Sequence, residues 1–356
     1  MIPVTKTFLP PIEEYISNVQ RAYNNGWLTN RGELVCELEK KLMEYLGLTD
    51  SKILCMNNGT IPLQIALKVL GKGGEIITTP FSYVATTAAI VWENCTPVFV
   101  DIHPDYLTID ETKIEAAITE KTTCILATHV FGNPCNVEEI ERIAKKNNLK
   151  VIYDAAHCFG VKYKGKSIFE YGDVSTCSFH ATKVFHTGEG GGIFCKDEEL
   201  YKKLFYSHNF GHNGPHDFHG VGINGKMSEL HAAMGLAVLN DIDAILKKRL
   251  EIVESYSKEL NAENFRFLKI REYTEWNYSY FPLILKDESH LISIQSTLND
   301  KDIFPRRYFY PSLNKLNYLK SFEMPNSDDI SNRIFCLPLY HDLSIENIDI
   351  IINSLN

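Results

Sequence analysis

Between residues 50 and 195 the chain alternates short apolar segments with stretches of helical periodicity, and this alternation limits the folds it can adopt. Several apolar segments are continuous, which is typical of strands covered on both faces. Strands separated by helices usually join through crossovers, so the pattern predicts an α/β fold with a mostly parallel sheet wrapped by helices. The expected strands are Lys52–Met56, Glu75–Thr79, Thr96–Ile102, Thr123–His129, Lys150–Asp154, Ser175–Phe179 and Gly192–Cys195. The expected helices between them include Asn58–Leu70, Tyr83–Glu93 and Val137–Lys146.

The pattern changes after Lys226. Apolar residues recur at spacings of three and four from Met227 to Ile245, which predicts one long amphipathic helix starting near Ser228. We expect this helix to lead into a smaller C-terminal α+β domain. The predicted division is an extended N-terminal arm over 1–15, a large domain over 16–244 and a small domain over 245–356.

Composition narrows the class of protein and of partner. A chain of 356 residues with 44% hydrophobic content is long enough to bury a sizeable core. The net charge is −9 and the basic residues are scattered, which argues against nucleic acid as a partner but leaves room for a local anion pocket. No apolar run approaches the roughly 18–20 residues that span a bilayer, so we expect no membrane partner. Nine cysteines without a C-x-x-C pair predict reduced thiols and a cytoplasmic location.

Two residues, one at the end of a predicted strand and one just beyond another, point to one cofactor. Asp154 ends an apolar segment, and Lys183 lies in a turn of small residues beyond Ser175–Phe179. A lysine in a partly desolvated site can hold pyridoxal phosphate as a Schiff base, and a carboxylate then faces the pyridine nitrogen of the cofactor. The pair therefore indicates pyridoxal phosphate, with Lys183 also moving the proton. The structural alternatives are a surface lysine and a helix-capping aspartate.

Further residues fit the same interpretation. Gly59 and Thr60 follow a strand and open a helix, so their backbone and hydroxyl groups suit a phosphate, with Ser178 as a second hydroxyl. Tyr83 could stack on the cofactor ring, and His157 would lie beside its phenolic oxygen. An ordinary helix cap, a core tyrosine and a structural histidine remain the alternatives.

The chain as a whole resembles the nucleotide-sugar aminotransferases, which are pyridoxal-phosphate enzymes of fold type I acting on keto-deoxyhexoses attached to a nucleoside diphosphate. The similarity covers nearly the full length, and each motif is weak alone but the set is specific. The matching stretches are 26–32, 58–60, 80–86, 99–101, 129–132, 154–157, 178–183, 189–191 and 222–227.

The resemblance implies a role for each matching residue. Lys183 matches the catalytic Schiff-base lysine. The residues implied around the cofactor are Gly59, Thr60, Tyr83, Asp154, His157, Ser178, Lys183 and Asn224. Asn224 matches an asparagine that reaches the phosphate from a neighbouring subunit, which implies a homodimer with shared active sites. The residues implied on the substrate side are Thr29, Lys226 and Tyr310, although relatives commonly have arginine at the position of Lys226.

The resemblance also implies the reaction. An amino group passes from L-glutamate, through pyridoxamine phosphate, to a dTDP-4-keto-6-deoxyhexose. The product is a dTDP-4-amino-4,6-dideoxyhexose for surface glycans such as the lipopolysaccharide O-antigen. The 3-keto isomer, giving a 3-amino-3,6-dideoxy sugar nucleotide, shares the same motifs and stays open. A cyclitol aminotransferase and a non-catalytic regulator of the same fold are less favoured.

Three other patterns resemble functional motifs but do not support the functions they suggest. The histidines His208, His212, His216 and His219 invite a metal site, but intervening glycine and proline prevent a shared helix face, so we expect no metal. The run Gly188–Gly192 lacks the spacing of a dinucleotide fingerprint. The basic and aromatic stretch Arg306–Pro311 suits a loop near a nucleotide-sugar pocket better than nucleic acid.

Overall fold

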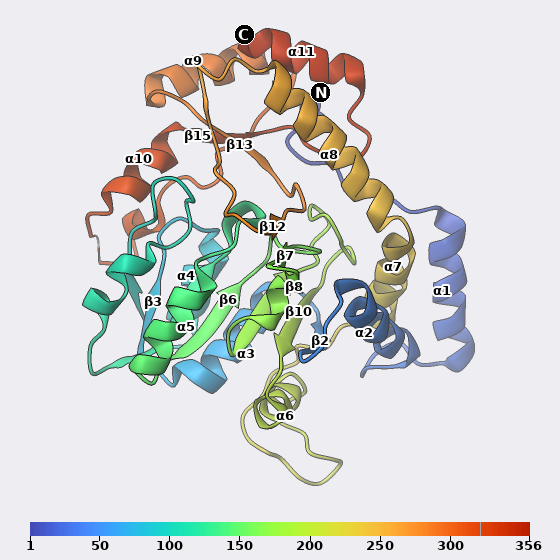
Figure 1. Cartoon of the computed structure of the whole chain (residues 1–356). Coiled ribbons are helices and arrows are strands. Elements are labelled where there is room, and N and C mark those ends of the chain that lie inside the picture. The colour runs from blue at the N-terminus through green and yellow to red at the C-terminus, as the bar shows by residue number, and fades with distance from the viewer. Residues whose placement is uncertain (321) are drawn as a thin grey trace.

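A seven-stranded sheet forms the centre of the larger part of the molecule, in the order β2-β10-β9-β6-β5-β3-β4. The computed structural model describes residues 1–320 and 322–356, and Figure 1 shows the sheet below a smaller C-terminal part. Neighbouring strands are parallel except at β10, which is antiparallel to both β2 and β9. The strands are β2 (Lys52–Met56), β3 (Glu75–Thr78), β4 (Thr96–Phe99), β5 (Thr122–Thr128), β6 (Lys150–Asp154), β9 (Val174–Ser178) and β10 (Gly191–Cys195).

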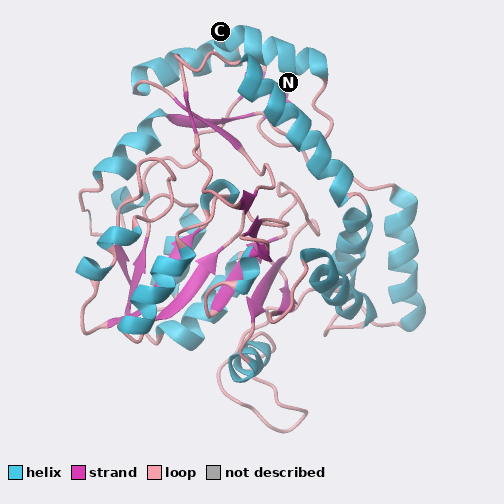
Figure 2. Ribbon diagram, viewed as in Figure 1, coloured by secondary structure: helices cyan, strands magenta, loops and turns pink. Residues whose placement is uncertain are grey.

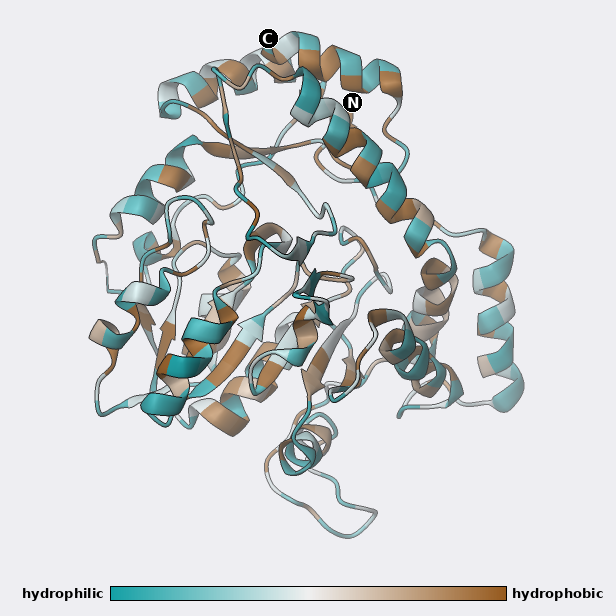
Figure 3. Ribbon diagram, in the orientation of Figure 1, coloured by the Kyte–Doolittle hydropathy of each residue, from teal (hydrophilic) through white to brown (hydrophobic). Residues whose placement is uncertain are grey.

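Helices cover both faces of this sheet (Figure 2), which confirms the predicted fold class. Along β2, Ile53 and Cys55 face one apolar cluster while Leu54 and Met56 face another, because successive side chains of a strand point to opposite sides. The hydropathy colouring in Figure 3 marks the strands as mostly apolar, as a sheet buried on both faces requires.

The helices divide between the two clusters. One face is covered by α2 (Glu33–Leu46), α5 (Val137–Lys146) and α7 (Glu229–Asn240), with α1 (Ile12–Asn25) packed on α7. The other face is covered by α3 (Thr60–Ala66), which continues as a π-helical turn over Leu67–Gly71, and by α4 (Val84–Trp92) and α6 (Glu198–Ser207). Among the described residues, no helix is both long and apolar enough to cross a membrane.

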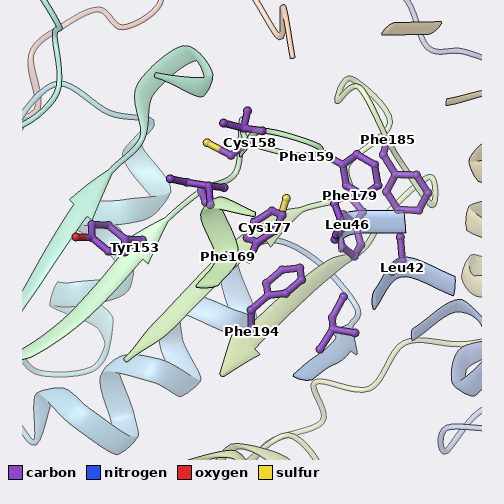
Figure 4. Close-up of a cluster of buried hydrophobic side chains, with 14 of the residues drawn as sticks. Leu42, Leu46, Tyr153, Cys158, Phe159, Phe169, Cys177, Phe179, Phe185 and Phe194 are labelled. Atoms are coloured by element: carbon purple, nitrogen blue, oxygen red, sulfur yellow. The ribbon is translucent and has the colours of Figure 1, made fainter. Parts of the chain in front are cut away.

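A buried aromatic cluster fixes the turn that carries Lys183 (Figure 4). Phe179 and Phe185 flank this turn, and their ring centroids lie 5.1 Å apart in an edge-to-face arrangement. Phe159 stacks on Phe185 at 4.4 Å. Because both ends of the turn are anchored in the core, the residues between them have a defined direction.

The single long helix predicted from Met227 to Ile245 is wrong, since two helices take its place. The first, α7, ends at Asn240, and α8 (Ile242–Glu259) begins after Asp241. Asp241 has φ −104° and ψ 2°, and short polar side chains such as Asp favour such non-helical breaks. The break lets α7 pack on the large sheet while the later turns of α8, at Ile252 and Tyr256, pack in the C-terminal cluster.

The C-terminal part combines a small antiparallel sheet with several helices. Its antiparallel sheet contains β11 (Arg266–Phe267), β13 (Phe281–Ile284) and β15 (Ile334–Leu337), and its further helices are α9 (Glu288–Asn299), α10 (Pro325–Arg333) and α11 (Ile345–Leu355). The N-terminal β1 (Ile2–Pro3) pairs with β14 (Ile303–Phe304). Three short strands, β7 (Lys162–Tyr163), β8 (Lys166–Ser167) and β12 (Thr274–Glu275), form a separate sheet. The predicted domain limits stay predictions, although separate apolar clusters favour a division near the start of α8.

Candidate active site

A pocket of about 520 Å³ opens where the strands β2, β6 and β9 end. Ligand sites in parallel α/β sheets form at the carboxyl ends of strands. The pocket contains seven of the residues singled out in the sequence: Gly59, Thr60, Tyr83, Asp154, His157, Ser178 and Lys183. The C-terminal part closes it from the other side with Tyr280, Arg306, Tyr308 and Phe309. The sequence did not single out Tyr280, Tyr308 or Phe309 individually for the site.

Lys183 lies half-buried on the turn after β9, and its Nζ is 3.4 Å from the hydroxyl oxygen of Tyr280. Burial lowers the pKa of the Lys183 ammonium, while the nearby Tyr308 and Asp154 act in the opposite direction. A lowered pKa increases the neutral fraction of the amine, and only the neutral amine can attack a carbonyl.

Asp154 ends β6 and is 6% exposed. Its Oδ2 accepts a hydrogen bond of 2.7 Å from the hydroxyl of Thr86, and its Oδ1 accepts one of 3.1 Å from the backbone N–H of Ala156. Burial raises the pKa of the Asp154 carboxyl, and these two donors and the charge of Lys183 counteract that shift. The carboxylate therefore occupies the floor of the pocket with one donor on each oxygen.

The imidazole of His157 has a defined donor direction. The backbone N–H of Phe131 donates to His157 Nδ1 over 3.1 Å, so in the neutral ring the proton sits on Nε2. Burial and the charge of Lys183 hold the pKa of His157 well below its ordinary value. His157 therefore offers a neutral N–H donor to a group bound in the pocket.

Only some of the groups at the N-terminus of α3 are available to bind a phosphate. The side chain of Asn58 accepts hydrogen bonds of 2.9 Å from the backbone N–H groups of Thr60 and Ile61, so these donors are already paired. The hydroxyls of Thr60 and Ser178 remain at the pocket wall. A Cβ on Gly59 would lie 2.6 Å from Cβ of Ser178, which is why glycine is required where the turn after β2 passes the end of β9.

Tyr83 is 54% exposed and lines the mouth of the pocket. Its ring lies at 53° to that of Phe309, with centroids 6.4 Å apart. A ring that is free on one face can stack on a planar cofactor.

Four of the predicted residues do not line the pocket of this chain: Thr29, Asn224, Lys226 and Tyr310. The Nζ of Lys226 bonds instead to Asn209 Oδ1 at 2.7 Å and lies 4.6 Å from the ring centroid of Phe210. Tyr310 lies against the guanidinium of Arg307, which is 3.5 Å from its ring centroid. Asn224 is exposed where the loop after α6, which projects from the body in Figure 1, returns to the sheet.

Within 1–320 and 322–356, no group of three or more His, Cys, Asp or Glu side chains is arranged to hold a metal ion.

The residues present fit pyridoxal phosphate. A buried carboxylate, a neutral imidazole N–H and a lysine amine surround one pocket, and two hydroxyls stand beside a glycine that permits close approach. These groups match the pyridine nitrogen, the phenolic oxygen, the aldehyde carbon and the phosphate of the cofactor.

Comparison with known proteins leads to the same class of enzyme. A dTDP-4-amino-4,6-dideoxy-D-glucose transaminase of Shigella dysenteriae is 40% identical, over 99% of this chain and 97% of the relative. A transaminase of the same description from Escherichia coli is 39% identical, over 97% and 95%. The crystal structure of DesI with its TDP-sugar product has a TM-score of 0.93 and 27% identity, over 99% of this chain and 92% of that chain.

A sugar aminotransferase described as putative, Spr1654 from Streptococcus pneumoniae, has been solved in a form containing PMP, the pyridoxamine phosphate state of the cofactor. It has a TM-score of 0.92 and 26% identity, over 100% of this chain and 98% of that chain. Residues 11–356 match one family along almost the whole chain. The protein therefore belongs to the DegT/DnrJ/EryC1/StrS aminotransferase family of pyridoxal-phosphate-dependent enzymes.

Proposed function

We propose that this enzyme transfers the amino group of L-glutamate to a dTDP-4-keto-6-deoxyhexose and releases a dTDP-4-amino-4,6-dideoxyhexose for surface glycan synthesis. The observation that carries the proposal is that the amine of Lys183 and the buried carboxylate of Asp154 line the same pocket. The substrate follows from full-length relatives at 40% and 39% identity, both described as dTDP-4-amino-4,6-dideoxy-D-glucose transaminases.

The chain's own groups divide the work. Pyridoxal phosphate, when bound, supplies an electron sink for negative charge on the carbon that bears the amino group. Asp154 would hold the proton on the pyridine nitrogen, and His157 would donate its Nε2–H to the phenolic oxygen. The hydroxyls of Thr60 and Ser178 would bind the phosphate. Lys183 would be the attachment point and would move the proton between donor and cofactor at its Nζ.

We assign Arg306 to an anionic group of the substrates. It lines the pocket, and its backbone is held by hydrogen bonds of 3.2 and 2.8 Å with Cys336. Its guanidinium lies 5.0 Å from the ring centroid of Tyr308 and, among the described residues, has no carboxylate partner. A guanidinium beside a site that must accept glutamate and a diphosphate is suited to bind carboxylate or phosphate oxygens.

We propose a homodimer in which each site is completed by the other subunit. The loop after α6 projects from the body and exposes Phe210, Phe218 and Val221 by 49%, 60% and 76%. Exposed apolar side chains gathered on a projecting loop are typical of an interface. The dimer would bring Asn224 and Lys226 of one chain to the pocket of its partner. A cytoplasmic location is part of the proposal, because all nine cysteines are free thiols.

One experiment separates this reaction from its alternatives. Purified protein is incubated with L-glutamate and either dTDP-4-keto-6-deoxyglucose or its 3-keto isomer, and the product is identified by NMR. We expect 2-oxoglutarate in proportion to a sugar aminated at C4. Amination at C3 would contradict the proposed position of the new amino group. Absence of 2-oxoglutarate would contradict transamination from glutamate. A GDP-linked 4-keto sugar is a further arm, because a GDP-perosamine synthase of Escherichia coli O157:H7 is 31% identical over 98% of this chain.

A further inference from the structure

A chain of buried hydroxyl groups lies directly behind Asp154. Thr128 ends β5, Ser82 precedes α4, and Thr86 lies in the first turn of α4. Their Oγ atoms follow one another at 3.1 Å and 2.7 Å, and Thr86 Oγ1 is 2.7 Å from Asp154 Oδ2. All three hydroxyl residues are at most 5% exposed, and none of them lines the pocket.

The donor direction along this chain can be worked out. Thr128 donates to Ser82, so the hydroxyl hydrogen of Ser82 is free to point to Thr86. Thr86 accepts that hydrogen bond and donates its own hydroxyl hydrogen to Asp154. Each hydroxyl acts once as donor, and hydrogen bonds that follow one direction in a dry interior strengthen one another. The strongest donation therefore falls on one oxygen of the catalytic-site carboxylate.

We propose that Thr86, backed by Ser82 and Thr128, is a positioning residue that keeps the Asp154 carboxylate ionised and aimed at the pyridine nitrogen of the cofactor. The inference rests on the proposed function, because it assigns to Asp154 the pyridine partner's role. The second oxygen of Asp154 is oriented by Ala156 N–H, so the two bonds together define the plane of the carboxylate.

The neighbouring residue provides a matched control within the same helix. Thr87 is, like Thr86, 0% exposed, but its hydroxyl has no hydrogen-bond partner among the described residues. A valine at either position removes one hydroxyl and keeps the shape. Only the valine at position 86 removes a donor to Asp154.

The test measures binding of pyridoxamine phosphate to the full-length apo-protein by calorimetry, because this form needs no covalent bond to Lys183. We expect Thr86→Val to weaken binding about tenfold, as for loss of a hydrogen bond to a charged group. Thr87→Val is expected to stay within about twofold of the unaltered protein. Thr86→Ser keeps the hydroxyl and should recover most of the affinity.

The pH dependence of pyridoxamine phosphate binding is a further measurement, and it should not change if Thr86 has only a structural role. The charged and titratable groups that act on Asp154 are the amine of Lys183 and the thiols of Cys158 and Cys177. The imidazole of His157 lines the same pocket, and all four groups are unchanged in the variants. Without the Thr86 hydroxyl the carboxylate of Asp154 is harder to ionise. As the pH is lowered, cofactor binding should therefore be lost at a higher pH in Thr86→Val than in Thr87→Val.

Two outcomes overturn the inference. One is a Thr86→Val protein that binds as Thr87→Val does, and the other is a Thr86→Ser protein as weak as Thr86→Val. If the unaltered protein itself does not bind pyridoxamine phosphate, the proposed function fails before the hydroxyl chain is tested. Thermal melting of both valine variants checks that each is folded.

Discussion

The floor of the pocket is the region around Asp154 and His157, and the open side is its mouth. The two regions differ in how completely a single chain forms them. On the floor, Asp154 and His157 are 6% and 8% exposed, and each has a backbone N–H that fixes its orientation. On the open side, Tyr83 is 54% exposed, and the guanidinium of Arg306 has no carboxylate partner among the described residues. The floor is thus organised before any ligand arrives, whereas the open side has polar groups still to be placed by substrate or by a second subunit.

The largest expected effect comes from the floor. Replacing Lys183 by alanine should abolish turnover, because no other amine lines the pocket among the described residues. Binding of cofactor can persist without the lysine, since Asp154, His157 and the phosphate ligands remain. The measurement is borohydride reduction of the loaded protein followed by peptide mass mapping, which should place the adduct on Lys183.

The exposed Lys196 is the matched control, because it follows β10 outside the pocket. Lys196→Ala should keep full turnover and the same adduct. An adduct found elsewhere in the unaltered protein, or normal turnover by Lys183→Ala, would contradict the assignment of this residue.

The second prediction concerns the open side and requires two subunits. Lys183→Ala and Asn224→Ala proteins are each expected to have little activity, but in a mixed dimer one site combines the intact Lys183 with the partner's intact Asn224. Random mixing makes half of the dimers mixed, with one good site of two. Activity should therefore rise to about a quarter of that of the unaltered enzyme.

Mixing is done after mild unfolding and refolding, and each variant refolded alone serves as the control. No recovery on mixing, with dimers confirmed by sedimentation, would show that Asn224 serves its own chain or none.

A smaller effect should separate two adjacent arginines. Arg306→Gln is expected to raise KM for an anionic substrate about tenfold or more and to leave cofactor binding unchanged, because it removes a charged hydrogen-bond donor from the pocket. Arg307 is paired with Glu288 at 2.9 Å and with the backbone carbonyl of Asn332 at 2.9 Å. Arg307→Gln should therefore lower stability and leave KM nearly unchanged.

Steady-state kinetics with glutamate and sugar nucleotide varied in turn identifies which anion Arg306 binds. An unchanged KM for both substrates in Arg306→Gln would refute the assignment. If Arg307→Gln raised KM by a similar factor, the effect would belong to the loop rather than to the charge of Arg306.

The same contrast between floor and open side explains what the sequence could predict. The strands β2 and β6 have the predicted bounds, because continuous apolar runs end sharply at polar residues. Asp154 and Lys183 could be found because the first ends such a strand and the second lies in the turn after a strand. Tyr280 could not, since its place opposite Lys183 depends on how the C-terminal part packs on the sheet.

Two further features could not be predicted from the sequence. The role of Thr86 is hidden in sequence, because a threonine among alanines and valines in α4 looks like one more small buried residue. The break at Asp241 interrupts an apolar periodicity that continues on both sides, so spacing alone could not separate α7 from α8. In both cases the deciding contact is with another part of the chain.

The last effect we predict is a pH dependence of stability beside Asp154. His129 follows β5 beside Asp154, is fully buried, and accepts a 2.9 Å hydrogen bond from Cys135 N–H at Nδ1. Burial lowers the pKa of His129 to about 3. The unfolded chain therefore takes up a proton near its ordinary pKa of about 6.5 while the folded chain does not, so stability present above that pH is lost as the pH falls.

From pH 7.5 to 5 this group should cost about 2 kcal/mol of the free energy of unfolding. His129→Asn keeps an acceptor for Cys135 but cannot titrate, so urea unfolding should show a loss smaller by that amount. Equal losses in His129→Asn and the unaltered protein would mean that His129 takes up its proton in the folded protein as well, which would contradict a closed interior beside Asp154.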